Sequence, residues 1–259
     1  MIIPTTMTQR NTPPSTGPYT LPWAPAEVVR YLIEVTRSRK WDTRPGGLVT
    51  VNYEQARWLL WHRITQRLQA NNETWYDEPR NRPVIANLLR YVLNLENTVF
   101  NPRRGILLYG TFGCGKTTLM EDLAAVGTVL GRRTWRYANM KTIELEHRSA
   151  SDLDFLKKYF VGNWLFDDLG YEDSTKRYGN EEDAWSYILH QRALQHERTG
   201  YRTHVITHRN LAETQRLYDP NGADGHLGSR MAALLQPVPL AGPNHRNQCK
   251  IIQSHRSSS

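Results

Sequence analysis

Apolar residues recur at helical spacing in three segments within the first 95 residues, at 26–37, 53–70 and 83–95. In the second segment the apolar positions are Ala56, Leu59, Leu60, Ile64 and Leu68. Trp58 and Trp61 flank this stripe, and we interpret them as core residues rather than as platforms for nucleic-acid bases. The pattern therefore predicts three amphipathic helices, the third opening with Pro83 in its first turn.

From residue 105 onward, short apolar runs alternate with amphipathic segments. The expected strands are 106–109, 134–137, 164–166, 203–206 and 238–240. The expected helices are 117–130, 153–160, 181–197, 211–217 and 227–235. This alternation predicts an α/β fold in which helices cover both faces of a parallel sheet.

These patterns divide the 259 residues into four parts. Residues 1–25 are rich in Thr and Pro and are expected to be a flexible tail, and 251–259 a flexible end. Residues 26–82 form a predicted helical region that binds a partner or DNA, and 83–250 form the main domain. No apolar run approaches the ~20 residues that a membrane span requires, and the first residues lack the pattern of a signal peptide, so we expect a cytoplasmic protein with no membrane partner.

The formal net charge of +8 is concentrated near the N-terminus. Residues 1–104 contain 14 Lys and Arg against 8 Asp and Glu, together with several Trp and Tyr. Cationic and aromatic side chains suit a phosphodiester partner, single- or double-stranded, but a solubilising surface around an aromatic core would have the same composition. Both interpretations remain open at this point.

A glycine-rich turn joins the apolar run at 105–109 to the helical pattern that follows. Gly110, Gly113 and Gly115 allow positive φ, so that successive backbone N–H groups can converge on a phosphate. Lys116 can reach the β and γ phosphates of ATP, and the Thr117 hydroxyl can bind Mg²⁺. The expected nucleotide-binding residues are Gly110, Thr111, Phe112, Gly113, Cys114, Gly115, Lys116, Thr117 and Thr118.

A second apolar run ends in two carboxylates, Asp167 and Asp168. A phosphate-binding loop requires acids opposite to it, one to hold Mg²⁺ and one to orient water. We assign Asp167 to the metal and Asp168 to the attacking water. Cys114 and Cys249 are interpreted as reduced bystanders, and the acidic cluster 181–183 as the start of a helix.

The segments Gly105-Ile-Leu-Leu-Tyr-Gly-Thr-Phe-Gly-Cys-Gly-Lys-Thr-Thr-Leu, Phe166-Asp-Asp-Leu-Gly170 and Tyr178-Gly-Asn180 resemble the DnaC/IstB-type branch of the AAA+ ATPases, over roughly residues 83–246. The resemblance implies a P-loop NTPase fold of the AAA+ type with a parallel sheet, preceded by a small helical N-terminal region. It also implies ATP hydrolysis, and a partner that is either a replicative helicase, which members of this branch load, or a transposase, which they assist.

The resemblance also suggests residues that act from outside the loop. The family has a polar sensor after the strand that follows the paired acids, and one extra residue here leaves Thr207 and Asn210 as alternatives. Arg230, in Gly228-Ser229-Arg230-Met231, resembles the arginine that reaches the γ-phosphate in a neighbouring subunit, which implies self-association into an ATP-dependent oligomer. His226 stands where the family often has a second arginine, and Arg246 matches the family's closing arginine.

Two other functions would use the same loop. A P-loop kinase of a small metabolite needs an acceptor site, but the expected strand at 133–138 carries no carboxylate. A DNA-binding adaptor that does not hydrolyse ATP would not need Asp168. We therefore expect a DNA-associated ATPase that acts as a switch between assembled subunits.

Overall fold

The computed structural model describes residues 53–71, 73, 78–132, 134–150, 152–170, 183–218 and 226–244. All of them belong to one compact unit, residues 42–259. The expected helix at 26–37, the two terminal segments, the motif at 178–180, Glu181, Glu182, Arg246, Cys249 and the His226 side chain lie outside the described residues. No helix in the described ranges is long and apolar enough to cross a membrane.

Five strands form a wholly parallel sheet in the order β2-β3-β4-β1-β5. They are β1 (Gly105–Tyr109), β2 (Arg136–Asn139), β3 (Trp164–Leu169), β4 (Thr203–Thr207) and β5 (Leu235–Pro239). The predicted parallel sheet is confirmed, although β2 begins two residues later and β5 three residues earlier than expected. The start of β5 was not predicted because the strand contains Pro237 and Pro239. Proline is tolerated in β5 because it is an edge strand.

Seven α-helices and one 3₁₀ helix surround this sheet within the described residues. They are α2 (Tyr53–Ala70), α3 (Asn81–Leu93), α4 (Lys116–Val129), α5 (Met140–Ser149), η1 (Asp154–Tyr159), α6 (Ala184–Thr199), α7 (Leu211–Tyr218) and α8 (His226–Leu234). The prediction missed α5, which buries only Met140, Ile143 and His147 and so has a weak apolar pattern. The segment at 153–160 was predicted as an α-helix and is a 3₁₀ helix.

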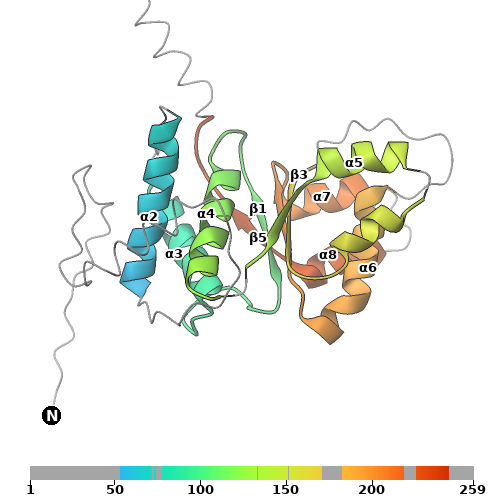
Figure 1. Ribbon diagram of the computed structural model, residues 1–259, viewed down its shortest axis with the longest axis horizontal. Coiled ribbons are helices and arrows are strands. Elements are labelled where there is room, and N and C mark those ends of the chain that lie inside the picture. The colour runs from blue at the N-terminus through green and yellow to red at the C-terminus, as the bar shows by residue number, and fades with distance from the viewer. Residues whose placement is uncertain are drawn as a thin grey trace, which may run out of the picture. The chain divides into compact units, whose positions relative to one another are not determined.

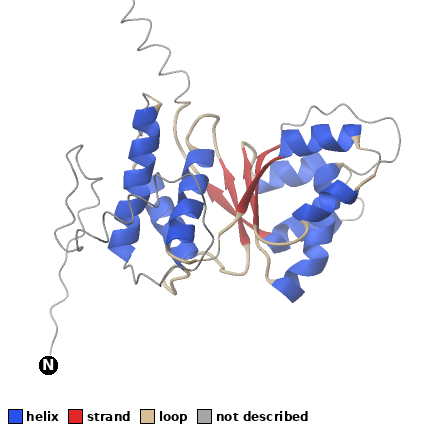
Figure 2. Cartoon of the chain, in the orientation of Figure 1, coloured by secondary structure: helices blue, strands red, loops and turns tan. Residues whose placement is uncertain are grey.

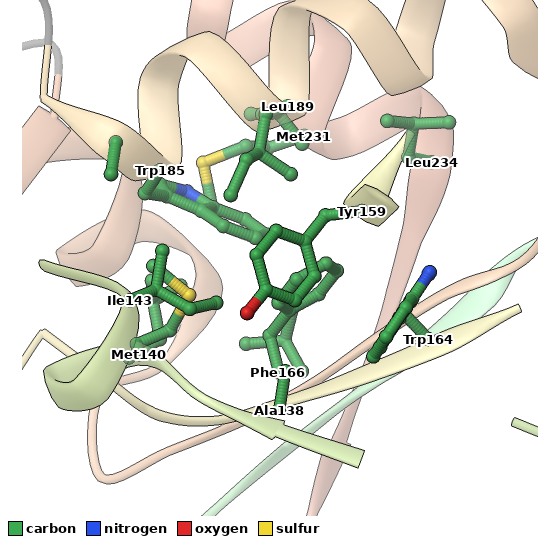
Figure 3. Close-up of a cluster of buried hydrophobic side chains, with 14 of the residues drawn as sticks. Ala138, Met140, Ile143, Tyr159, Trp164, Phe166, Trp185, Leu189, Met231 and Leu234 are labelled. Carbon is green, nitrogen blue, oxygen red and sulfur yellow. The ribbon is translucent and has the colours of Figure 1, made fainter. Parts of the chain in front are cut away.

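Helices cover both faces of the sheet, as expected (Figures 1 and 2). The helices α2, α3 and α4 lie on one face, and α5, α6, α7 and α8 on the other (Figure 1). The core on the second face is aromatic: Phe166 of β3 meets Trp185 of α6 edge to face, with ring centroids 5.4 Å apart (Figure 3). The residues with catalytic potential are therefore carried on a rigidly packed sheet.

The helix α2 is attached to α4 by charged side chains. Arg63 Nε lies 3.3 Å from Asp122 Oδ1, and Arg67 pairs with Glu121. Burial raises the pKa of Asp122, and the two arginines oppose that rise. The basic composition of this region suited a nucleic-acid partner. In the structure, two of its arginines instead dock α2 on α4, the helix that follows the glycine-rich loop. Trp58 is buried, which confirms its interpretation as a core residue, while Trp61 is partly buried.

We expect Arg63→Ala to lower the free energy of unfolding by about 2 kcal/mol, because it leaves the Asp122 carboxylate buried without its nearest cation. Arg57→Ala is the control on the same helix: its pair with Glu54 is exposed and should contribute less than about 0.5 kcal/mol. Urea unfolding of the two variants measures the difference. Equal midpoints would show that the ion pair does not hold α2 in place.

Candidate functional site

The loop between β1 and α4 has the backbone geometry that the sequence predicts. Gly113 and Gly115 have φ of 70° and 89°, in the left-handed region. Gly110 also has a positive φ, 155°, and in addition a Cβ added there would lie 2.1 Å from the Leu240 carbonyl oxygen. The loop thus needs glycine both for its turn and for close packing against the chain after β5.

That neighbouring segment, residues 240–244, holds the loop from one side. The Leu240 N–H donates to the Tyr109 carbonyl at 2.8 Å, and the Thr111 hydroxyl donates to the Gly242 carbonyl. The Cys114 sulfur is buried, 3.7 Å from the Leu240 carbonyl oxygen. The side chains of Thr111 and Cys114 therefore contact protein and fix the loop against this segment.

Asn81, at the start of α3, binds the same segment through two hydrogen bonds. Its side-chain amide donates to the Ala241 carbonyl at 2.7 Å, and its side-chain oxygen accepts from the Ala241 N–H at 2.9 Å. Asn81 itself is only 4% exposed, so these two hydrogen bonds are shielded from water. Sequence reasoning missed this residue because its partner is 160 positions away.

Lys116 is buried within the loop. Its Nζ donates to the carbonyl oxygens of Gly110, at 2.8 Å, and Thr111, at 2.7 Å. Burial lowers the pKa of Lys116, and the nearby Cys114, Asp167 and Asp168 oppose that change. The ammonium group thus lies within the glycine-rich turn, bonded to its carbonyl groups, and its contact with phosphates stays a prediction.

Asp167 is buried at the carboxyl end of β3, next to the start of α4. Its Oδ2 accepts from the Thr117 hydroxyl at 2.9 Å and from the Tyr137 hydroxyl at 3.0 Å. Burial, and then the charge of Asp168, raises the pKa of Asp167. A hydroxyl beside a carboxylate supplies two hard oxygen ligands, which fits Mg²⁺ that is also bound by the phosphates of a nucleotide. Within the described residues, no cluster of three or more His, Cys, Asp and Glu forms a separate metal site.

Asp168 is held apart from its neighbour by the backbone. Its φ of 60° lies in the left-handed region, at an irregularity in the pairing of β3 with β4. Its carboxylate is exposed and accepts from Asn139 Nδ2 at 2.9 Å. The two acids are therefore separated into a buried group beside Thr117 and an exposed group that is hydrogen-bonded to Asn139 of β2.

Tyr137 and Asn139, which contact these acids, were missed by the sequence analysis. They lie two residues apart on β2, and in the sheet Tyr137 is beside Leu165 and Asn139 beside Asp167. The expected strand ended at residue 137, so it did not place Asn139 next to the acids. Only the observed register of β2 and β3 brings these residues to the site.

The two candidates for the polar sensor both make structural hydrogen bonds. The buried Thr207 hydroxyl donates to the Leu169 carbonyl at 2.8 Å. Asn210 caps α7: its side-chain oxygen accepts from the Glu213 N–H, and its own N–H donates to the Glu213 carboxylate, each at 2.9 Å. Their assignment as sensors stays a prediction.

In this connection after β4, His208 lies against the glycine-rich loop. Its ring centroid lies 4.8 Å from that of Phe112, and Arg209 Nε donates to its Nε2 at 3.1 Å. Burial lowers the pKa of His208, as do the charges of Arg209 and Lys116. His208 therefore lies beside the glycine-rich turn, and a histidine directly after an apolar strand was the signal that could have identified it.

Arg230 lies on α8, on the face of the sheet opposite to α4 (Figure 1). Its guanidinium contacts His190 Nδ1 of α6. Two other positions considered in the sequence have local structural roles. Thr118 lies in the first turn of α4, and Asp183 caps α6 by accepting from the Ser186 N–H. The structure thus brings Lys116, Thr117, Asp167 and Asp168 together and places Arg230 elsewhere.

Comparison with known proteins yields similarity only among solved structures. No family model and no curated protein matches the chain. The DnaI structure is 19% identical with a TM-score of 0.49, covering 68% of this chain and 88% of that one. The DnaC helicase loader is 18% identical with a TM-score of 0.45, covering 80% and 98%. DnaA from Aquifex aeolicus, bound to AMPPCP, is 20% identical with a TM-score of 0.44, covering 71% and 53%.

The phosphate-binding loop leads from a central strand into α4, and the paired acids end the strand two places along in the five-stranded parallel sheet. The chain thus has an α/β fold in which a glycine-rich loop and a pair of acids lie at the carboxyl ends of a wholly parallel five-stranded sheet.

Proposed function

We propose that this chain is a cytoplasmic, ATP-dependent and DNA-associated switch protein that loads a replicative helicase or assists a transposase. The observation that carries the ATPase part is the pairing of Asp167 with Thr117 at 2.9 Å, beside an exposed Asp168. The choice of partner rests on the motif resemblance alone.

In this proposal Lys116 exchanges the carbonyls of Gly110 and Thr111 for the β and γ phosphates of ATP. Thr117 and Asp167 hold Mg²⁺, which neutralises developing phosphate charge when bound. Asp168, positioned by Asn139, polarises the attacking water. His208 contacts Phe112 of the loop and lies shortly before α7, so in this proposal it couples the conformation of the loop to the start of α7.

Phosphate release from ATP, measured against protein concentration with and without single- or double-stranded DNA, tests this function. A specific rate that rises with concentration and with DNA supports a site completed between subunits on DNA. A slow rate indifferent to both contradicts the switch. Transfer of phosphate to a metabolite would instead identify a kinase, and tight binding without turnover would identify an adaptor.

We expect Arg230→Ala to leave ATP binding intact and to lower the concentration-dependent hydrolysis rate by at least about 100-fold, because an arginine supplied by a neighbouring subunit stabilises transition-state charge. His190→Ala is the matched control, since it removes the contact that Arg230 makes with α6 and keeps the arginine. Normal turnover by the Arg230 variant would exclude this arginine from the intersubunit site.

A further inference from the structure

A pocket of about 380 Å³ lies at the amino edge of the sheet, at the opposite ends of the strands from the phosphate-binding loop. Its described lining residues are Val92, Asn94, Gly131, Arg132 and Arg202. They come from the end of α3, the turn after α4 and the residue before β4. The volume is in the range of small-ligand sites, and none of these lining residues is acidic.

Arg202 is the unusual member of this pocket, because it is only 9% exposed. Its guanidinium carbon lies 5.0 Å from the centre of the Tyr91 ring, and the two side chains interact electrostatically. No carboxylate forms an ion pair with Arg202 among the residues that the structure describes. Burying a cation without an anionic partner is costly, so the ring compensates for part of that cost and leaves the charge available to a ligand.

The charges around the pocket indicate what kind of ligand it accepts. Arg132 and Arg202 contribute two positive charges. The carboxyl ends of α3 and α4 also meet here, and each contributes about half a negative charge. The sum is about one positive charge, so the pocket suits an anion, and the single negative charge of a phosphodiester balances it.

The pocket is also preformed. A Cβ added at Gly127 would lie 2.9 Å from Val92 Cγ1, so α3 and α4 pack closely beside it. Tyr91 is anchored below Arg202, since its hydroxyl donates to the Arg104 carbonyl at 2.7 Å. The cation therefore lies on a fixed ring rather than on a mobile surface.

We propose that Arg132 and Arg202 bind a phosphodiester group of a nucleic-acid strand at this edge of the sheet. The proposal deepens the DNA association in the proposed function and does not depend on ATP hydrolysis. The nucleic-acid strand would then contact the edge of the sheet that lies away from the nucleotide. Mutations at this pocket should therefore weaken DNA binding without changing ATP turnover.

The test is the affinity of the full chain for a fluorescein-labelled oligo(dT) at several salt concentrations. Arg132→Gln and Arg202→Gln are each expected to weaken binding about 10-fold and to reduce the slope of log affinity against log salt by about 0.7. Arg132 is exposed, so its replacement does not disturb folding, and Arg202→Lys should recover part of the affinity. Arg216→Gln, an exposed arginine on α7 over the other face, is the control.

The outcomes separate this proposal from the proposed function. Unchanged affinity and slope in both glutamine variants would overturn the pocket assignment while wild-type DNA binding stands. Failure of the wild-type chain to bind DNA would overturn both, and phosphate release would then show whether the ATPase remains. If inorganic phosphate raises the melting temperature of the wild type and of neither variant, with oligonucleotide binding unaffected, the pocket binds free phosphate and the nucleic-acid assignment is wrong.

Discussion

Replacing Lys116 with alanine is expected to weaken ATP binding by about 100-fold or more, which corresponds to about 3 kcal/mol. The ammonium is the only full positive charge contributed by the loop 110–118, and it lies among the backbone groups that would surround the phosphates. Titration with a fluorescent ATP analogue in the presence of Mg²⁺ measures the loss. The same variant should lose phosphate release in parallel.

The control for this prediction is Lys157→Ala, which removes an exposed lysine paired with Asp154 on η1. Far-UV circular dichroism verifies that both variants are folded. An unchanged dissociation constant for the Lys116 variant would mean that the loop does not bind nucleotide, and every proposal that depends on ATP would fail with it.

Replacing Asp168 with asparagine is expected to lower the hydrolysis rate by about 100- to 1,000-fold while ATP and Mg²⁺ still bind. Asparagine tolerates the left-handed backbone of this position, where φ is 60°, so the substitution removes the charge and little else. Asp167→Asn should differ in kind: it removes the charge beside the Thr117 hydroxyl and should weaken the Mg²⁺-dependent part of binding.

Single-turnover phosphate release at saturating ATP and Mg²⁺ measures the Asp168 effect without contribution from product release. Asp154→Asn, an exposed acid on η1, controls for the loss of a negative charge. Wild-type turnover by the Asp168 variant would show that the exposed carboxylate does not act on water. It would favour a different residue such as His208, whose ring centroid lies 4.8 Å from that of Phe112 in the loop.

Local patterns were sufficient for much of the fold. The helix at Tyr53–Ala70 was predicted with its observed bounds, because one side has a regular stripe of apolar residues and the sequence is free of Gly and Pro. The strands β1, β3 and β4 were located because they are buried apolar runs. Edge strands were placed less well, since β2 has polar residues and β5 has two prolines.

The candidate site divides in the same way. Lys116, Thr117, Asp167 and Asp168 were identified in the sequence because each lies in a short motif whose chemistry depends on neighbouring residues. Tyr137, Asn139 and His208 were not, because their roles depend on strand register and on the path of the chain after β4. The docking of α2 through Arg63 joins positions 59 apart, which no local pattern reports.

The sequence by itself therefore determined the parallel α/β class, the glycine-rich loop and the pair of acids, since these follow from the identity and spacing of adjacent residues. Tertiary structure alone decided that Asp167 is buried against Thr117 while Asp168 is exposed, that Thr207 and Asn210 bond to the backbone, and that Arg132 and Arg202 meet at one pocket. The physical reason is that burial, register and long-range contacts set which side chains share a site, and these arise only when the sheet and its helices pack together.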